Sequence, residues 1–464
     1  MPQRSLPQPG ENKMGIMPVG RLLFTMAAPM ILSMLVQALY NVVDTLFVAR
    51  IYEDEENTDR LMAAMSLAFP IQNLQIGFAT GVGVGVNALL SKSLGQGNQK
   101  MANTAAGNGV FLTGVITVLF MLFGLVGVRP FFSAMSDDPL VVESGTTYTT
   151  ICSLLTLGVF VSILCERLLQ ATGRTVYTML TQGLGAVLNI ILDPCFIFGW
   201  GFFPKLGIAG AAVATVVGQF CAAGLGIYLN LKKNPDIHIS RSALRPCARA
   251  IKPILTVGIP SVVMVAVGSV MNVSMTAILN TFETVKVAAV GVFGTYFKLQ
   301  SFFFMPLFGL NNATISIVAY NFGARNKARI QKTLKLAVLT ALGFMLVGMA
   351  VFMLLPDVLL KLFEPSPTFL AIGTGALRII SLHFPLAAVG IALGASFQAL
   401  GNGIYSTFTS LCRQMLVLIP AAWLLSLSGN VHDVWWSFPI AEVASVTASL
   451  LFFLRIYNQK IKPL

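Results

Sequence analysis

The feature that most limits what this chain can fold into is its series of long apolar segments. Twelve of them are long enough to cross a bilayer as helices, since one span needs about 20 apolar residues. They lie at about 21–50, 61–91, 103–128, 139–166, 176–200, 206–231, 252–281, 287–319, 333–355, 368–398, 404–427 and 434–456. Only 10% of the residues are charged, whereas a soluble protein carries about 25%. The sequence therefore predicts an all-α polytopic membrane protein.

The basic residues indicate how the segments are oriented. If the N-terminus is cytoplasmic, 21 Lys and Arg residues fall on that side of the membrane and six on the other side. This excess follows the positive-inside rule, so we expect a multi-pass protein of the cell membrane with both termini cytoplasmic. The net charge of +12 is spread over short connections, which argues against a nucleic-acid partner. The expected large partner is the lipid bilayer.

The two halves of the chain resemble each other. Residues 81–98 match 309–326, and residues 170–177 match 398–405 at the same offset of 228. Six crossings return the chain to its starting side, so the repeat is parallel, with a pseudo-two-fold axis along the membrane normal. Two bundles joined by one linker favour a secondary transporter with alternating access over a receptor or a membrane enzyme. We expect tails at 1–20 and 458–464, six-helix lobes at 21–231 and 252–457, and a basic cytoplasmic linker at 232–251.

An acidic residue interrupts the first apolar segment. Asp44 would cost about 2.5 kcal/mol or more at the bilayer centre, so its default interpretation is functional. Gln37 and Asn41 share its helix face, and Tyr40 lies beside them. Pro29 predicts a kink near the start of the helix. The alternative is a polar contact between two helices.

Polar residues of the fifth segment extend this pattern. Asn189 and Asp193 are one turn apart, and Gln182 shares their face. Carboxylate and amide oxygens suit Na⁺, whereas two close carboxylates suit the binding and release of a proton, so both coupling ions stay open. No structural metal is expected, but Na⁺ could bind at Asp44, Asn189 and Asp193. We expect the coupling site to comprise Asp44, Asn189, Asp193, Glu166, Tyr40 and Asn41.

Glu166 in the fourth segment has two interpretations. It follows Tyr148 by eighteen residues, five full helical turns, so the two side chains share a face and could contribute to one polar pocket. It also precedes Arg167, and a salt-bridged position at the cytoplasmic end is equally compatible with the sequence.

The second half lacks an equivalent carboxylate. Asn272 stands opposite Asn41 in the repeat, and Lys298 is the notable charge of the eighth segment. Aromatic and Met side chains nearby could form an adaptable apolar wall, although most such side chains are core or lipid-facing. We expect the substrate cavity to involve Gln37, Gln182, Tyr148, Asn272, Lys298, Phe297 and Met271.

The sequence lacks the motifs of several functional classes. No GxxxxGK[ST] sequence occurs, so no ATP-driven motor is expected. Gly81, Gly83 and Gly85 lie within an apolar segment, where close helix packing explains them better than phosphate binding. No catalytic Ser/His/Asp pattern occurs, and the six cysteines show no CxxC spacing. We therefore expect neither an enzyme nor a protein with a bound cofactor.

Several motifs, in their order and spacing along the chain, resemble those of a known family. Pro29 precedes Asp44 in the first segment, and NIILDP occupies 189–194. SLGQGN at 93–98 and NFGARN at 321–326 end paired segments, and paired QAxG turns follow. This combination is similar to the multidrug and toxic compound extrusion (MATE) transporters over essentially the whole chain.

The resemblance implies an antiporter that exports cationic or amphipathic organic compounds in exchange for H⁺ or Na⁺. It implies two lobes around a V-shaped central cavity, with the coupling site on Asp44, Asn189 and Asp193. It also implies that the first helix bends at Pro29 when a carboxylate is protonated. Acids that some relatives carry in the seventh and tenth helices are missing here, which argues against a cation site in the second lobe.

A flippase for a lipid-linked saccharide, from the same superfamily, is the alternative. Such flippases tend towards a cationic cavity, and Lys298 and Arg413 favour this interpretation. Twelve segments and the carboxylates of the first lobe favour drug export instead. We expect a monomeric exporter of small organic molecules.

Overall fold

The computed structural model describes residues 12–48, 51, 55–201, 203–363 and 366–464. All regular secondary structure in this part of the chain is helical, which confirms the all-α prediction. Ten helices are long and apolar enough to cross a membrane. Two bent pairs, α6 with α7 and α14 with α15, bend by 49° and 46° and raise the number of spans to twelve if each pair crosses once. This agrees with the twelve segments predicted from the sequence.

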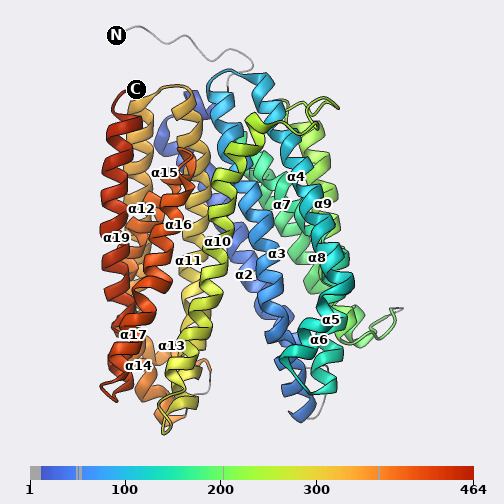
Figure 1. Ribbon diagram of the computed structural model, residues 1–464, viewed down its shortest axis with the longest axis vertical. Helices are drawn as coiled ribbons and strands as arrows, with labels where there is room; N and C mark the ends of the chain where they lie inside the picture. The colour runs from blue at the N-terminus through green and yellow to red at the C-terminus, as the bar shows by residue number, and fades with distance from the viewer. Residues whose placement is uncertain (1–11, 49–50, 52–54, 202, 364–365) are drawn as a thin grey trace. The chain divides into compact units, whose positions relative to one another are not determined.

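The helices follow the chain as labelled in Figure 1. The first half contains α1 (Lys13–Ile16), α2 (Val19–Val48), α3 (Glu55–Gly95), α4 (Gln99–Val126), α5 (Val128–Met135), α6 (Pro139–Leu154), α7 (Leu157–Ala171), α8 (Thr175–Phe198) and α9 (Ile208–Lys233). The second half contains α10 (Ala248–Leu279), α11 (Lys286–Gly323), α12 (Lys327–Leu354), α13 (Pro356–Lys361), α14 (Pro367–Ser381), α15 (Phe384–Ala399), α16 (Gly403–Leu411), α17 (Leu418–Ser426), α18 (Val431–Val434) and α19 (Ser437–Ile456). Two π-helices, η1 (Cys412–Leu416) and η2 (Tyr457–Ile461), complete the series.

The chain forms two compact units whose boundaries fall inside helices. Unit 2 comprises residues 32–262, and unit 1 comprises residues 263–464 together with the described residues up to Ile31. The boundaries therefore lie within α2 and α10, in each case two residues after a proline, Pro29 or Pro260. The compact units thus differ from the two halves of the sequence, and the division into lobes at 21–231 and 252–457 stays a proposal.

Each unit contains the beginning of a helix from the other half of the sequence, and hydrogen bonds hold the residues just before that helix. In unit 1, Arg329 of α12 donates hydrogen bonds of 2.8 Å to the carbonyl oxygens of Met14 and Met17, just before α2. In unit 2, Asn108 of α4 accepts from the Cys247 N–H at 2.8 Å, just before α10. The first turns of α2 and α10 are therefore fixed to the unit formed mainly by the other half of the sequence.

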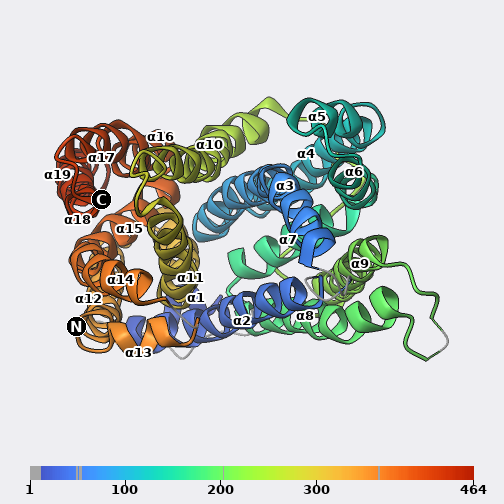
Figure 2. The ribbon, with the colours of Figure 1, turned by 90° about the horizontal axis from the view of Figure 1, so that it is seen from below.

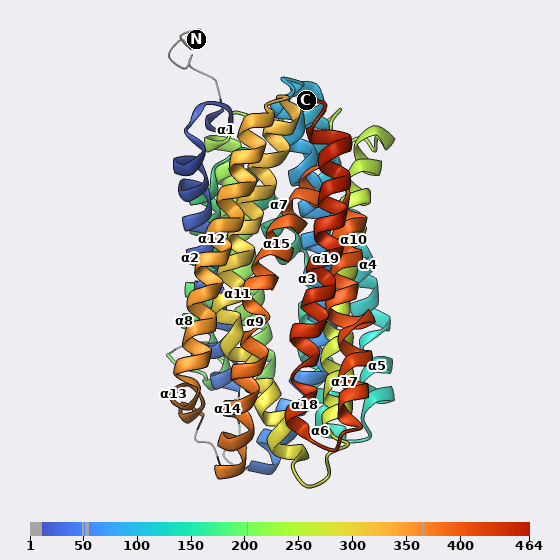
Figure 3. The same ribbon diagram turned by 90° about the vertical axis from the view of Figure 1, so that its left-hand side faces the viewer.

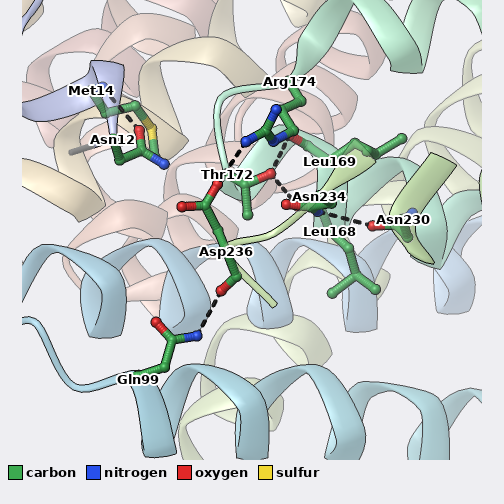
Figure 4. A network of polar contacts seen from close by, with 10 residues as sticks. All are labelled: Asn12, Met14, Gln99, Leu168, Leu169, Thr172, Arg174, Asn230, Asn234 and Asp236. Atoms are coloured by element: carbon green, nitrogen blue, oxygen red, sulfur yellow. Dashed lines mark hydrogen bonds and ion pairs between the residues drawn. The ribbon is translucent and has the colours of Figure 1, made fainter. Parts of the chain in front are cut away.

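The linker between the halves is also held on unit 2. Arg174 forms an ion pair of 3.2 Å with Asp236, and Gln99 donates to the Asp236 carbonyl oxygen at 2.7 Å (Figure 4). Asn234 donates to Asn230 at the end of α9. These contacts give the basic linker a defined path along one end of unit 2.

Unit 2 is built around α3, which packs against α4, α6 and α7 (Figure 2). Its glycines allow the N-terminal part of α10 to approach closely. A Cβ at Gly81 would lie 2.6 Å from the Gly258 carbonyl oxygen, and a Cβ at Gly85 would overlap the Ile254 carbonyl group. Close helix packing therefore explains these glycines, as the sequence predicted.

Unit 1 is built around α15, which packs against α11, α12 and α19 (Figure 3). Its core is rich in aromatic side chains, among them Tyr296, Phe352 and Phe384, which are fully buried or nearly so. The α1 helix and the C-terminus lie at the same end of this unit (Figure 3).

Candidate functional site

Two acidic side chains meet between α2 and α8 of unit 2. The carboxyl groups of Asp44 and Asp193 lie close enough to interact directly with each other. Asp193 is fully buried, and one oxygen of each carboxyl group is buried without a hydrogen-bond partner in the described structure. Because a carboxylate is an acceptor only, this contact requires a proton on one of the two groups or a cation in its place. The pair can therefore hold one small positive species.

Asn189 supports this pair from one turn earlier on α8. When its amide nitrogen faces Asp193, it donates to Oδ2 at 3.0 Å, and its oxygen accepts from the hydroxyl and the N–H of Thr215 on α9. We assign this orientation because it satisfies both atoms of the amide, whereas the reverse leaves the carboxylate facing an oxygen. The predicted grouping of Asp44, Asn189 and Asp193 is thus present in the fold.

Glu166 forms a second polar centre in the same unit. Its carboxylate accepts hydrogen bonds from Gln182 at 2.7 Å and from Ser162 at 3.4 Å. The neighbouring Arg167 donates to Gln170 at 3.0 Å and also interacts electrostatically with Glu166. Glu166 is only 6% exposed. Of the two interpretations left open by the sequence, the geometry favours a place in the polar pocket.

A cavity of about 130 Å³ extends from Glu166 to Asn189, the residue that supports the carboxylate pair. Glu166 and Gln182 line one part of it, and Asn189 and Thr215 line another. Gln37 of α2 also contributes to its wall. The cavity is large enough for several water molecules, since one occupies about 30 Å³ in the liquid. The polar faces predicted separately for α2, α7 and α8 therefore converge on one interior space of unit 2.

Tyr148 lies on α6, one turn before Cys152, in the neighbourhood of Asp44. It is 2% exposed and accepts a hydrogen bond of 3.0 Å from Gln72 of α3. The Cys152 thiol, one turn further along α6, contacts both residues and lies close to Asp44. Tyr148 is thus a buried neighbour of the pair, and its assignment to the substrate cavity stays a prediction.

Some of the predicted site residues lie outside the described side chains, and others lie away from the carboxylate pair. The side chains of Tyr40 and Asn41 are outside the described side chains, so their assignment stays a prediction. Pro29 lies within α2, in the part that belongs to unit 1. The amide of Asn272 donates to the Gly268 carbonyl oxygen of its own helix at 2.9 Å, and Lys298 is exposed in unit 1.

Two further candidates belong to the core of unit 1. Met271 is 5% exposed, and the Phe297 ring packs against Phe293 and Tyr296 with centroid separations of 4.9 and 5.3 Å. Their contribution to a substrate cavity stays a prediction.

Three neighbours of the site were not predicted from the sequence. Gln72, Cys152 and Thr215 contact the pair or its supporting groups. Gln72 and Thr215 are polar residues within apolar segments, and this signal could have marked them. In the described part of the chain, no group of three or more His, Cys, Asp or Glu side chains is placed to hold a metal ion.

Ten to twelve apolar spans in the described part of the chain, with a close pair of carboxyl groups among them, are typical of the class of polytopic membrane transporters. The family model MatE matches residues 29–195 and 260–424, so this chain belongs to the MatE family. The same model matches each half once, in agreement with the internal repeat. Members of this family are transporters of small organic molecules and need no cofactor, so the chain is not an enzyme.

Several characterised relatives match nearly the whole chain. An FAD transporter of Shewanella oneidensis is 25% identical over 95% of both chains. The multidrug export protein MepA of Staphylococcus haemolyticus is 24% identical over 93% of this chain and 92% of its own length. An outward-facing multidrug resistance MATE transporter has a TM-score of 0.90 at 23% identity, covering 99% of this chain and 100% of that one. A MOP superfamily transporter from Pyrococcus furiosus has the same score and identity, covering 98% and 100%.

Proposed function

We propose that this chain is a secondary active antiporter that exports cationic or amphipathic organic compounds in exchange for H⁺ or Na⁺ by alternating access. The observation that carries the proposal is the contact between Asp44 and Asp193 inside membrane-spanning helices. Carboxyl groups in such a place are costly unless they bind a proton, a cation or each other. Their presence in a family of transporters supports a role in coupling.

The pair changes its interactions when it gains or loses a positive species. With one proton or Na⁺ bound, the two carboxyl groups attract the shared ion; without it, they repel each other. Asp44 lies on α2, which passes from unit 1 to unit 2 just after Pro29. A change in the charge of the pair therefore acts on a helix that belongs to both units.

We place Glu166 and Gln182 in the same function. The cavity of about 130 Å³ gives a polar path from Glu166 to Asn189, which contacts Asp193. Water in this cavity would bring a proton or a hydrated cation as far as Asn189, next to the pair. The coupling site would then comprise two centres in unit 2.

The names of the relatives support transport of organic compounds, but they refer to different transported compounds. MepA is named a multidrug export protein, and the Shewanella relative is named an FAD transporter. The alternative, a flippase for a lipid-linked saccharide, would favour a cationic cavity. The cavity in unit 2 carries the Glu166 carboxylate instead, so we favour drug export by a monomer in the cell membrane with both termini cytoplasmic.

The test is transport in reconstituted vesicles. The full chain would be placed in liposomes loaded with a fluorescent organic cation, and a pH or Na⁺ gradient would be imposed. We expect one of the two gradients to drive movement of the dye, and the responding gradient identifies the coupling ion. A dye flux that ignores both gradients would contradict the proposal.

A further inference from the structure

A charged side chain of unit 1 faces a small cavity that the function proposed above does not use. The cavity has a volume of about 40 Å³. Among the residues that line it, Arg413 is the one with a formal charge. Its other polar walls include Asn311, Gln398, Ser406, Thr409 and Ser445. A group that enters this space therefore meets a guanidinium.

The guanidinium forms an ion pair with a carboxylate, that of Glu442, which is not among the residues lining the cavity. Nη1 of Arg413 lies 3.8 Å from Oε1 of Glu442 on α19. This separation is an ion pair without a direct hydrogen bond. The Glu442 side chain is 1% exposed and that of Arg413 is 20% exposed. Oε1 of Glu442 has no hydrogen-bond partner within the described structure. The pair is loose, and the N–H groups of Arg413 are available to a better acceptor.

An irregular backbone presents Arg413 to this space. Arg413 is the second residue of η1, where the Val417 N–H donates to the Cys412 carbonyl oxygen at 3.2 Å. A π-turn inserts one residue into a helix, rotates the side chains that follow, and occurs frequently at functional sites. Pro420 follows in α17 and removes a further helical donor. The chain thus keeps an unfavourable backbone where it carries the charged residue.

Three hydroxyl groups of the cavity, those of Ser406, Thr409 and Ser445, already donate to backbone carbonyl oxygens. Ser406 donates to the Gly394 carbonyl oxygen, and Ser445 donates to the Thr409 carbonyl oxygen, both at 3.0 Å. The charged donors that face an incoming group are the N–H groups of Arg413. A guanidinium binds the two oxygens of a carboxylate or phosphate with parallel charge-assisted hydrogen bonds.

We propose that this cavity is a subsite for the carboxylate or phosphate group of a transported compound. Arg413 binds the anionic group, and Glu442 serves as the internal counter-ion when the subsite is empty. As a cargo site it rests on the export function proposed above, and it extends the cargo from cations to compounds with an acidic group. The volume accommodates the head group alone, so the rest of the compound would lie outside the cavity.

Binding is measured on the purified full chain in detergent, without an ion gradient. The unfolding midpoint is followed against rising concentrations of benzoate, phenyl phosphate and benzamide at constant ionic strength. Benzamide has the shape of benzoate without its charge. We expect a larger stabilisation by benzoate or phenyl phosphate than by benzamide, and the stronger of the two identifies the preferred acid. Arg413→Gln is expected to lower the affinity for that anion about tenfold or more.

Two further variants make the result specific. Glu442→Gln removes the competing carboxylate while the guanidinium stays, so we expect severalfold tighter anion binding. Lys335→Gln removes an exposed cation of the same unit and is expected to change nothing. Equal stabilisation of the wild type by the anions and benzamide would overturn the proposal, as would anion binding that survives Arg413→Gln.

If Arg413→Gln fails to fold, Glu442→Gln decides the question. Tighter anion binding in that variant supports the subsite, and unchanged or weaker binding contradicts it. Because no gradient is involved, the result is separable from the coupling function. A chain that exports dyes but does not distinguish benzoate from benzamide would refute the subsite alone.

Discussion

Nε2 of Gln182 donates a 2.7 Å hydrogen bond to Oε2 of Glu166 and joins α8 to α7. A hydrogen bond to a charged group contributes about 1.5–3 kcal/mol, more than one between neutral groups. Both residues lie in the wall of the unit 2 cavity, which we propose as part of the coupling site.

Removal of this donor is expected to destabilise unit 2. Gln182→Ala leaves a buried carboxylate oxygen without its partner, so we expect the free energy of unfolding to fall by about 1–3 kcal/mol. The measurement is thermal unfolding in detergent. Gln219→Ala is the control because Gln219 lines the same cavity and is not a hydrogen-bond partner of Glu166. An equal effect of both variants would argue against the special role of Gln182.

Neutralisation of either member of the carboxylate pair is expected to abolish coupling. Asp44→Asn and Asp193→Asn each remove a group that we propose binds the coupling ion, while an amide still fits the space. We expect gradient-driven dye transport to be lost and the unfolding midpoint to stay close to that of the wild type. Asp137→Asn, at an exposed position of the same unit, should transport normally. Full gradient-driven transport by Asp44→Asn would refute the assignment of the coupling site.

Two glycines of unit 2 should respond differently to the same substitution. Gly85→Ala places a Cβ against the Ile254 carbonyl group, so α3 and α10 must separate. Overpacking of this kind costs about 1–3 kcal/mol. Gly183→Ala on α8 meets open space and is expected to be tolerated. Thermal unfolding of both variants tests the close approach, and equal stability of the two would contradict it.

Arg329 and Asn321 both hold the N-terminal segment by hydrogen bonds to its backbone, and Arg329 donates two of them. Arg329→Ala removes the two hydrogen bonds to the Met14 and Met17 carbonyl oxygens. We expect amide hydrogens near α1 to exchange faster, while those of α15 stay protected. Lys332→Ala, on the same helix, serves as the control. Unchanged exchange near α1 would show that other contacts hold the segment.

The helical spans and the carboxylate pair could be predicted from the sequence because both follow local rules. A charge within an apolar segment is costly, and helical spacing places Asn189 and Asp193 on one face. The direction of that face relative to other helices is not local. For this reason Thr215 and Gln72, uncharged residues on neighbouring helices, became visible only in the fold.

The contact between Arg413 and Glu442 could not be predicted from the sequence for a different reason. Spacing arguments assume 3.6 residues per turn, and η1 changes the phase of the helix at Arg413 itself. The unit boundaries were equally hidden, because α2 and α10 continue as apolar helices through Ile31 and Val262.

These boundaries bear on how a duplicated chain came to fold. Each half of the sequence gives the beginning of its first helix to the unit formed mainly by the other half. Two separate six-helix chains with this topology would have to exchange those helix ends, which is the arrangement of a domain-swapped dimer. A single fused chain satisfies the exchange within itself. Neither half, expressed alone, would contain all the helix segments that complete its own unit.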